Sequence, residues 1–94
     1  MLYDGGAMMY TREQAEIMRT QQLLSKELFK RLADKSGKDI DTVASRVLAT
    51  RTYSALMDPT SEFYAKSVEE LIYLLQLESR RDIKTWERQA ILKY

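Results

Sequence analysis

The side chains that could do chemistry in this chain are carboxylates, lysines, hydroxyls and tyrosines, because the sequence contains neither histidine nor cysteine. Thiolate nucleophiles, disulfides, the usual zinc sites and histidine general bases are therefore excluded. Glu69 and Glu70 are adjacent, and on a helix they point about 100° apart, so they cannot flank one scissile bond. Asp39 and Asp41 lack the further ligands of an EF-hand, and helix capping explains them better. We predict no enzymatic activity, no cofactor and no metal site.

Residues 32–51 superficially resemble a helix-turn-helix, a motif with which many regulators bind DNA. Ala33 is followed four residues later by Gly37, which is the spacing of the motif's tight turn. Lys38, however, stands where an apolar residue normally anchors the turn, and Arg46 stands where the second helix buries a side chain. The two departures favour a plain helical connection over a DNA-binding motif.

A second basic feature lies near the C-terminus, where four cationic side chains follow a helical spacing. A basic face of this kind can contact nucleic acid or an anionic membrane surface; its members are Arg80, Arg81, Lys84 and Arg88. Acidic residues interleave with them, so a solvated face stabilised by i,i+4 pairs explains the pattern better. Fifteen basic and fourteen acidic residues leave a net charge of +1, which does not favour general nucleic-acid binding.

The elements that position these residues are predicted to be helices whose starts and stops are marked by capping residues. Thr11 and Gln14 form a capping box that opens a helix running to about Ala33, and Gly37 is a natural left-handed stop. A second helix is predicted over about residues 41–57. The apolar residues of the first helix that share one broad arc, and should face the core, are Ile17, Met18, Leu24, Leu28, Phe29 and Leu32.

The only proline marks the middle of the chain. A residue before proline is pushed out of the helical region, so the second helix should stop near Met57. Asp58 can then cap a short turn of helix that starts at Pro59. A capping box at residues 67–70 opens the next helix. From there the chain forms either one helix to the C-terminus or two helices divided near Asp82, and the residues leave both open.

Three tyrosines lie around this middle segment: Tyr53, Tyr64 and Tyr73. They either line a ligand pocket or fill a small core with their hydroxyls at its rim, where each reaches water or backbone. The core interpretation is favoured, because tyrosines more often pack in a core than line a ligand pocket.

The fold predicted from these elements is an all-α bundle of three or four helices. Ninety-four residues make one domain with a radius of gyration of about 12 Å when compact. The domain should span residues 11–94, after a loosely ordered segment at residues 1–10. In the one-helix alternative the last helix is long and protrudes beyond the bundle. The longest apolar run is about five residues, so neither a signal peptide nor a transmembrane segment is expected, and the predicted location is the cytoplasm.

Apolar side chains outside the core-facing stripes predict a contact with a second chain. The helix from Ser67 is apolar nearly all round, as expected of the middle of a bundle or of a helix that contacts another protein. Trp86 is the expected main contributor, because buried tryptophans often dominate interfaces. The complete set of predicted contact residues is Leu23, Leu74, Leu77, Ile83, Trp86 and Ala90.

A pattern in the C-terminal half resembles that of short uncharacterised bacterial helical proteins, some of which are encoded in gene sets similar to toxin–antitoxin pairs. The residues that carry it are Thr52, Tyr53, Leu56, Asp58, Tyr64, Ser67, Leu71, Leu74, Leu75 and Glu78. The resemblance implies a protein-binding or regulatory role and transfers no site residue. We therefore expect a small interaction or regulatory module that acts through apolar helix faces and self-associates as a homo-oligomer. The alternative is a nucleic-acid-binding regulator.

Overall fold

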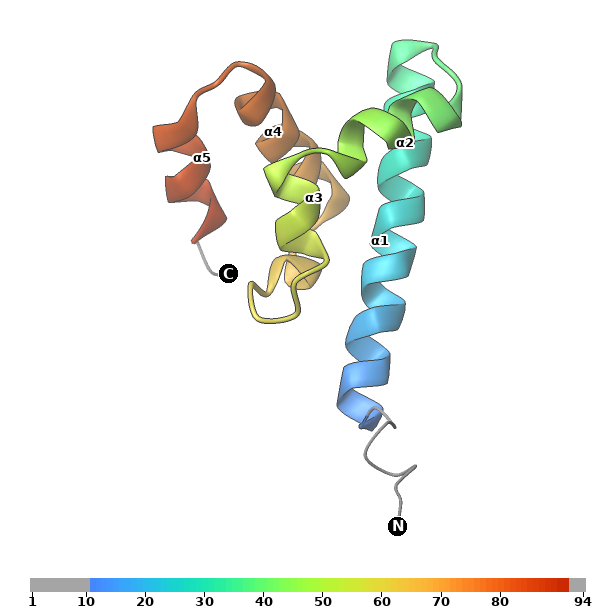
Figure 1. The fold of residues 1–94 in the computed structure, drawn as a ribbon, viewed down its shortest axis with the longest axis vertical. Coiled ribbons are helices and arrows are strands. Elements are labelled where there is room, and N and C mark those ends of the chain that lie inside the picture. The colour runs from blue at the N-terminus through green and yellow to red at the C-terminus, as the bar shows by residue number, and fades with distance from the viewer. Residues whose placement is uncertain (1–10, 92–94) are drawn as a thin grey trace.

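The computed structural model describes residues 11–91, so the segment at residues 1–10 that was predicted to be loosely ordered lies outside the described range. The described residues form helices and no strand, which confirms the predicted all-α fold (Figure 1). Residues 11–91 contain five α-helices, where three or four were predicted for the chain, and one short 3-10 helix. In chain order they are α1 (Arg12–Ser36), α2 (Ile40–Leu48), α3 (Arg51–Leu56), η2 (Phe63–Ala65), α4 (Val68–Ser79) and α5 (Ile83–Ala90).

The long element of the fold is the first helix and not the last. α1 has 25 residues, which makes it about 37 Å long, and its first turns extend past the other helices (Figure 1). Both of its predicted signals are present: Thr11 and Gln14 form the capping box, and Gly37 has φ 72°. Of the two alternatives left open for the C-terminal region, the single long helix does not form, because α5 has only 8 residues and folds back beside α4.

The helix predicted over residues 41–57 is interrupted, because a second N-terminus forms inside it. α2 ends at Leu48, and Thr50 then caps α3 by accepting a hydrogen bond from the Tyr53 N–H at 3.1 Å. Glu78, on α4, accepts the N–H groups of Arg51 at 2.6 Å and Thr52 at 3.0 Å. The donors that a helix start leaves without partners are thus satisfied from another helix, which local sequence patterns do not reveal.

The predicted helical turn at Pro59 does not form. α3 does stop before Met57 as predicted, but the Asp58 carboxylate accepts the N–H and the hydroxyl of Thr60, at 2.9 and 2.7 Å. This hydrogen bond two residues along makes a local turn in place of a helix start. The chain reaches η2 through Glu62, whose φ is 64°.

The C-terminal region forms two helices that are divided near Asp82, which is the second of the two alternatives. α4 opens with the predicted capping box and closes at Arg80, and the next residue, Arg81, takes φ 61°. The Asp82 N–H donates to the Leu77 carbonyl at 3.0 Å, as in a left-handed helix stop. The Asp82 carboxylate then caps α5 through the Thr85 N–H. The reversal places α5 against the core.

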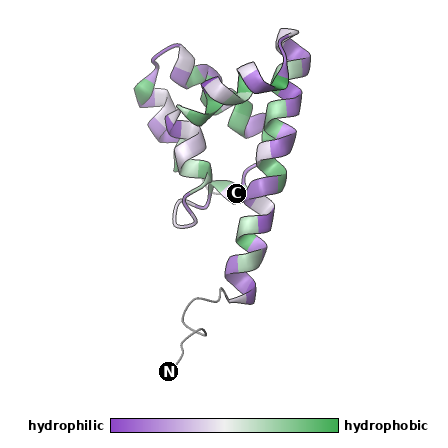
Figure 2. Cartoon of the chain, turned by 45° about the vertical axis from the view of Figure 1, so that its right-hand side comes forward, coloured by the Kyte–Doolittle hydropathy of each residue, from purple (hydrophilic) through white to green (hydrophobic). Residues whose placement is uncertain are grey.

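All five α-helices and η2 contribute residues to the core, and α1 contributes polar as well as apolar side chains. Of the predicted arc only Leu28 is fully buried; Met18 is exposed and the other four residues are half-buried. Gln21 and Ser25 are buried in their place. The Gln21 amide donates to the Leu56 carbonyl at 3.1 Å, which satisfies the end of α3. Figure 2 shows the alternation of hydrophilic and hydrophobic turns along α1.

An ion pair between Arg31 and Glu69 joins α1 to α4 on the surface. The hydrogen bond from Arg31 lowers the pKa of the Glu69 carboxyl. Because this pKa is lower in the folded than in the unfolded chain, the pair stabilises the fold above the ordinary carboxyl pKa, and the contribution is lost as pH falls through the folded value. We expect the urea midpoint to fall on acidification, and to fall less for Glu69→Gln. Glu16→Gln, on an exposed carboxylate, should match the wild type; if it matches Glu69→Gln instead, the pair is not responsible.

Candidate binding pocket between three helices

The residues predicted to contact a second chain divide into a buried and an exposed group. Leu74, Leu77 and Trp86 are only 2%, 3% and 8% exposed and belong to the core of the chain itself. Their apolar surface is buried within the fold, so little of it is left for contact with a second chain. Ala90 is half-buried against the same core.

The exposed group does not form a patch. Leu23 is 61% exposed on α1, and Ile83 is 40% exposed at the start of α5. The two helices lie at opposite sides of the molecule (Figure 1). Single exposed apolar side chains are common on soluble proteins and do not indicate a binding site.

Trp86 is buried because α5 packs where Glu78 of α4 is hydrogen-bonded to the start of α3. The indole N–H donates to the Thr52 hydroxyl at 2.8 Å, and this hydroxyl donates to the Glu78 carboxylate at 2.8 Å. The ring packs against Phe63, with ring centroids 6.0 Å apart, and the Arg51 guanidinium lies 5.3 Å from its centroid. A buried indole whose donor is satisfied is a stabilising core residue.

The four predicted basic residues are all exposed, but they divide between a turn and a helix. Arg80 and Arg81 lie in the turn after α4, whereas Lys84 and Arg88 lie on α5. Within the described range none of the four forms an ion pair, so the predicted i,i+4 pairs are not formed. The solvated character of this face agrees with the sequence-based interpretation.

Lys38 and Arg46, the residues that do not fit a helix-turn-helix, lie at one pocket. The pocket has a volume of about 240 Å³ and lies where α1, α2 and α4 meet. Both residues are exposed. The residues that line the pocket are Leu32 and Ser36 of α1, Lys38 of the following loop, Val43, Arg46 and Val47 of α2, Thr50, and Leu75 of α4.

The floor of the pocket is aliphatic. Val43 and Val47 are one helical turn apart on α2 and are buried, whereas Leu32 and Leu75 are half-buried and reach the pocket from α1 and α4. Side chains four positions apart share one face of a helix, so α2 presents its two valines to the core and to the pocket together. The floor of the pocket is thus an edge of the core that is open to the surface.

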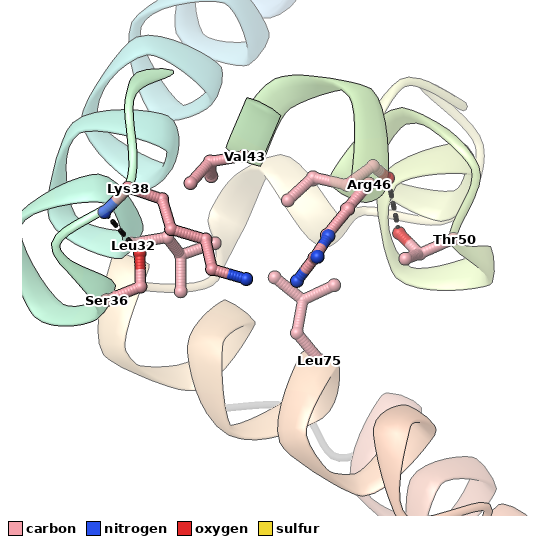
Figure 3. Close-up of a pocket in the computed structure, with 8 residues that line it drawn as sticks. Leu32, Ser36, Lys38, Val43, Arg46, Thr50 and Leu75 are labelled. Atoms are coloured by element: carbon pink, nitrogen blue, oxygen red, sulfur yellow. Dashed lines mark hydrogen bonds between the residues drawn. The ribbon is translucent and has the colours of Figure 1, made fainter. Parts of the chain in front are cut away.

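Two cations lie over this floor. The Lys38 ammonium and the Arg46 guanidinium point toward one another across the opening above Leu75 (Figure 3). In the part of the chain that the structure describes, neither side chain has a carboxylate partner. Like charges that converge repel one another unless an anion or water lies between them. The arrangement therefore favours an anionic group in the mouth of the pocket.

The neighbouring carboxylate of Asp39 caps α2 and, in the described residues, forms no ion pair with either cation. Its Oδ1 atom accepts the Thr42 N–H at 2.8 Å. This hydrogen bond lowers the pKa of Asp39, so the carboxylate is charged at neutral pH and is held at the start of the helix.

The lining of the pocket suits the binding of a group that is both apolar and anionic. Its lining combines aliphatic side chains, two hydroxyls and two cations, and it contains no carboxylate to act as a general base. Among residues 11–91, no three acidic side chains cluster as metal ligands would. None of the helices described is long and apolar enough to cross a membrane. Comparison of the chain with protein-family models, with curated proteins and with solved structures found no match.

Proposed function

We propose that this protein is a small interaction module that binds a segment of another protein chain in the pocket between α1, α2 and α4. The observation that carries the proposal is the convergence of Lys38 and Arg46, without ion-pair partners in the described residues, over an aliphatic floor. The resemblance found in the sequence implies the same class of role.

The size of the pocket favours a protein segment over a free small molecule. Its volume of about 240 Å³ is below the range of about 300–1,000 Å³ that is usual for sites of drug-sized ligands. Protein interfaces, in contrast, are often organised around a few anchor side chains that fill small apolar pockets. An anchor side chain inserted between Leu32, Val43 and Leu75 would complete the exposed edge of the core.

A second copy of this chain is a partner of this kind only in a head-to-tail arrangement. A symmetric dimer that paired pocket with pocket would bring two copies of Lys38 and of Arg46 together, and the four cations would repel one another. Self-association through the pocket therefore predicts a mass that grows with concentration, and light scattering on a sizing column measures it.

The test of the proposed function is a selection of peptides from a random displayed library on the folded protein. We expect the enriched peptides to bind the wild type and to bind Ser36→Trp about tenfold more weakly, because an indole at this exposed lining position covers the floor. Leu75→Glu is a second pocket variant, and its circular dichroism spectrum shows whether it folds.

Leu23→Glu is the matched control, because it places the same charge on a leucine that is exposed outside the pocket. It should bind the enriched peptides as the wild type does. Peptides that bind the pocket variants and the wild type equally, or a selection that enriches none, would contradict the proposed function.

The alternative, a nucleic-acid-binding regulator, is favoured by one observation: Arg80, Arg81, Lys84 and Arg88 are exposed and form no ion pair in the described residues. It predicts binding to mixed-sequence DNA that weakens steeply as salt is raised. Replacing Lys84 and Arg88 by glutamine should then abolish the binding. An absence of DNA binding at low salt would exclude this alternative.

A further inference from the structure

We infer that the segment bound in this pocket presents an aliphatic side chain flanked by carboxylates, so that the partner is an acidic and apolar peptide segment. The inference rests on the proposed function and adds the chemistry of the partner. Three features of the pocket support it: the convergent cations, the aliphatic floor and the occupied start of α2.

The cations come from two separate elements, which fixes them at opposite sides of the opening. Lys38 follows the left-handed Gly37 in the loop after α1, and Arg46 lies in the last turn of α2. A carboxylate between them can accept from both, and a guanidinium binds a carboxylate through two parallel hydrogen bonds. An anion placed here also relieves the repulsion between the two cations.

The floor sets the second requirement. Leu32, Val43, Val47 and Leu75 offer only methyl and methylene groups, so the group that enters must be apolar to gain from burial. Leucine or isoleucine supplies this surface, with the carboxylate on a neighbouring residue. On a helix, an acidic residue three or four positions away lies on the same face as the anchor.

Phosphate-bearing partners fit this pocket less well. No aromatic side chain lines it for stacking on a base. The N-terminus of α2, where a helix would offer N–H groups to a phosphate, is already capped by the charged Asp39 carboxylate.

The experiment compares two fluorescent peptides whose only difference is charge. Each carries two leucines in an alanine-rich host helix; one has the central sequence Glu-Ala-Ala-Leu-Leu-Ala-Ala-Glu and the other Gln-Ala-Ala-Leu-Leu-Ala-Ala-Gln, so that each leucine has a Glu or Gln three and four positions away. Fluorescence anisotropy gives the dissociation constant of each from the wild type, from the double variant K38Q/R46Q and from the control R19Q/K26Q. Arg19 and Lys26 are exposed on α1, so the control loses the same net charge away from the pocket.

We expect the Glu peptide to bind the wild type about fivefold more tightly than the Gln peptide, since each exposed charge pair contributes modestly. The advantage should disappear in K38Q/R46Q, persist in R19Q/K26Q and shrink as salt is raised. The two variants change only exposed side chains, and their circular dichroism spectra should match that of the wild type.

The outcomes separate this inference from the proposed function. If both peptides bind the wild type equally, or if the advantage of the Glu peptide survives in K38Q/R46Q, the acidic chemistry is wrong and the interaction module stands. The same conclusion follows if neither the Glu peptide nor the Gln peptide binds while library peptides without acidic residues bind in the pocket: the acidic chemistry is wrong and the interaction module stands. Hexanoate, a free carboxylate with an aliphatic chain, is titrated as a further probe. If hexanoate binds and neither peptide does, the ligand of the pocket is a free carboxylate and not a peptide segment, which overturns the inference. If no library peptide binds either, the proposed function fails as well.

Discussion

Trp86→Ala should lower the free energy of unfolding by about 3–5 kcal/mol, the usual cost of removing a large buried aromatic side chain. The substitution leaves a cavity between α5 and the Phe63 ring and removes the donor to the Thr52 hydroxyl. For a domain of this size the loss is a large part of the total stability. Urea denaturation followed by far-ultraviolet circular dichroism measures it.

Trp86→Phe is the control for this prediction, because it keeps an aromatic ring and removes the indole donor. It should cost less than the alanine variant and more than about 1 kcal/mol, since it leaves the fully buried Thr52 hydroxyl with one partner fewer. An alanine variant with an unchanged urea midpoint and a smaller mass in solution would contradict the account, because Trp86 would then act in a contact between chains.

Glu78→Gln should cost about 1.5–3 kcal/mol, the range for hydrogen bonds to a charged group. The carboxylate accepts the Arg51 N–H, the Thr52 N–H and the Thr52 hydroxyl. An amide has one acceptor oxygen and places an NH₂ donor against a donor of α3. The same denaturation experiment gives the difference. Glu87→Gln, on the exposed side of α5, is the matched control and should change the urea midpoint little. If the two variants lose the same free energy of unfolding, the hydrogen bonds of Glu78 do not stabilise α3.

The sequence predicts the helix boundaries whose hydrogen-bond partners are local, and misses the boundary that a distant residue completes. The capping boxes at Thr11 and Ser67 and the left-handed stop at Gly37 are local, because all their partners lie within a few residues. The interruption between α2 and α3 is not local, since Glu78 completes the start of α3 from 26 and 27 positions away. Sequence periodicity extended one helix across this break.

The residues of the core on α1 show a second limit of the same kind. Gln21 and Ser25 lie on the buried face because their polar groups find partners there, in the Leu56 carbonyl and the Gln21 carbonyl. A pattern that counts only apolar residues assigns such positions to solvent, although a buried polar group is stable when it is hydrogen-bonded.

The only sign of the candidate pocket in the sequence was that two residues departed from the helix-turn-helix pattern. Lys38 and Arg46 stood out because they contradicted a helix-turn-helix, and the structure shows that they converge. Leu75 could not be joined to them from the sequence, because it comes from α4 and reaches the pocket through tertiary packing. Tertiary packing also explains why Leu74, Leu77 and Trp86 were predicted to contact another chain. The turn at Arg81 folds α5 back, so that Trp86 joins the two leucines of α4 in one core.

The most direct test of the binding pocket is a methyl-resolved NMR titration of the isotopically labelled full chain with the tightest peptide from the selection. The account predicts concentration-dependent shifts of the methyl signals of Leu32, Val43 and Leu75, with those of Leu23 and Ile83 unchanged. Shifts confined to Leu23 or Ile83, with the signals of the pocket unchanged, would place the binding surface elsewhere and contradict the account.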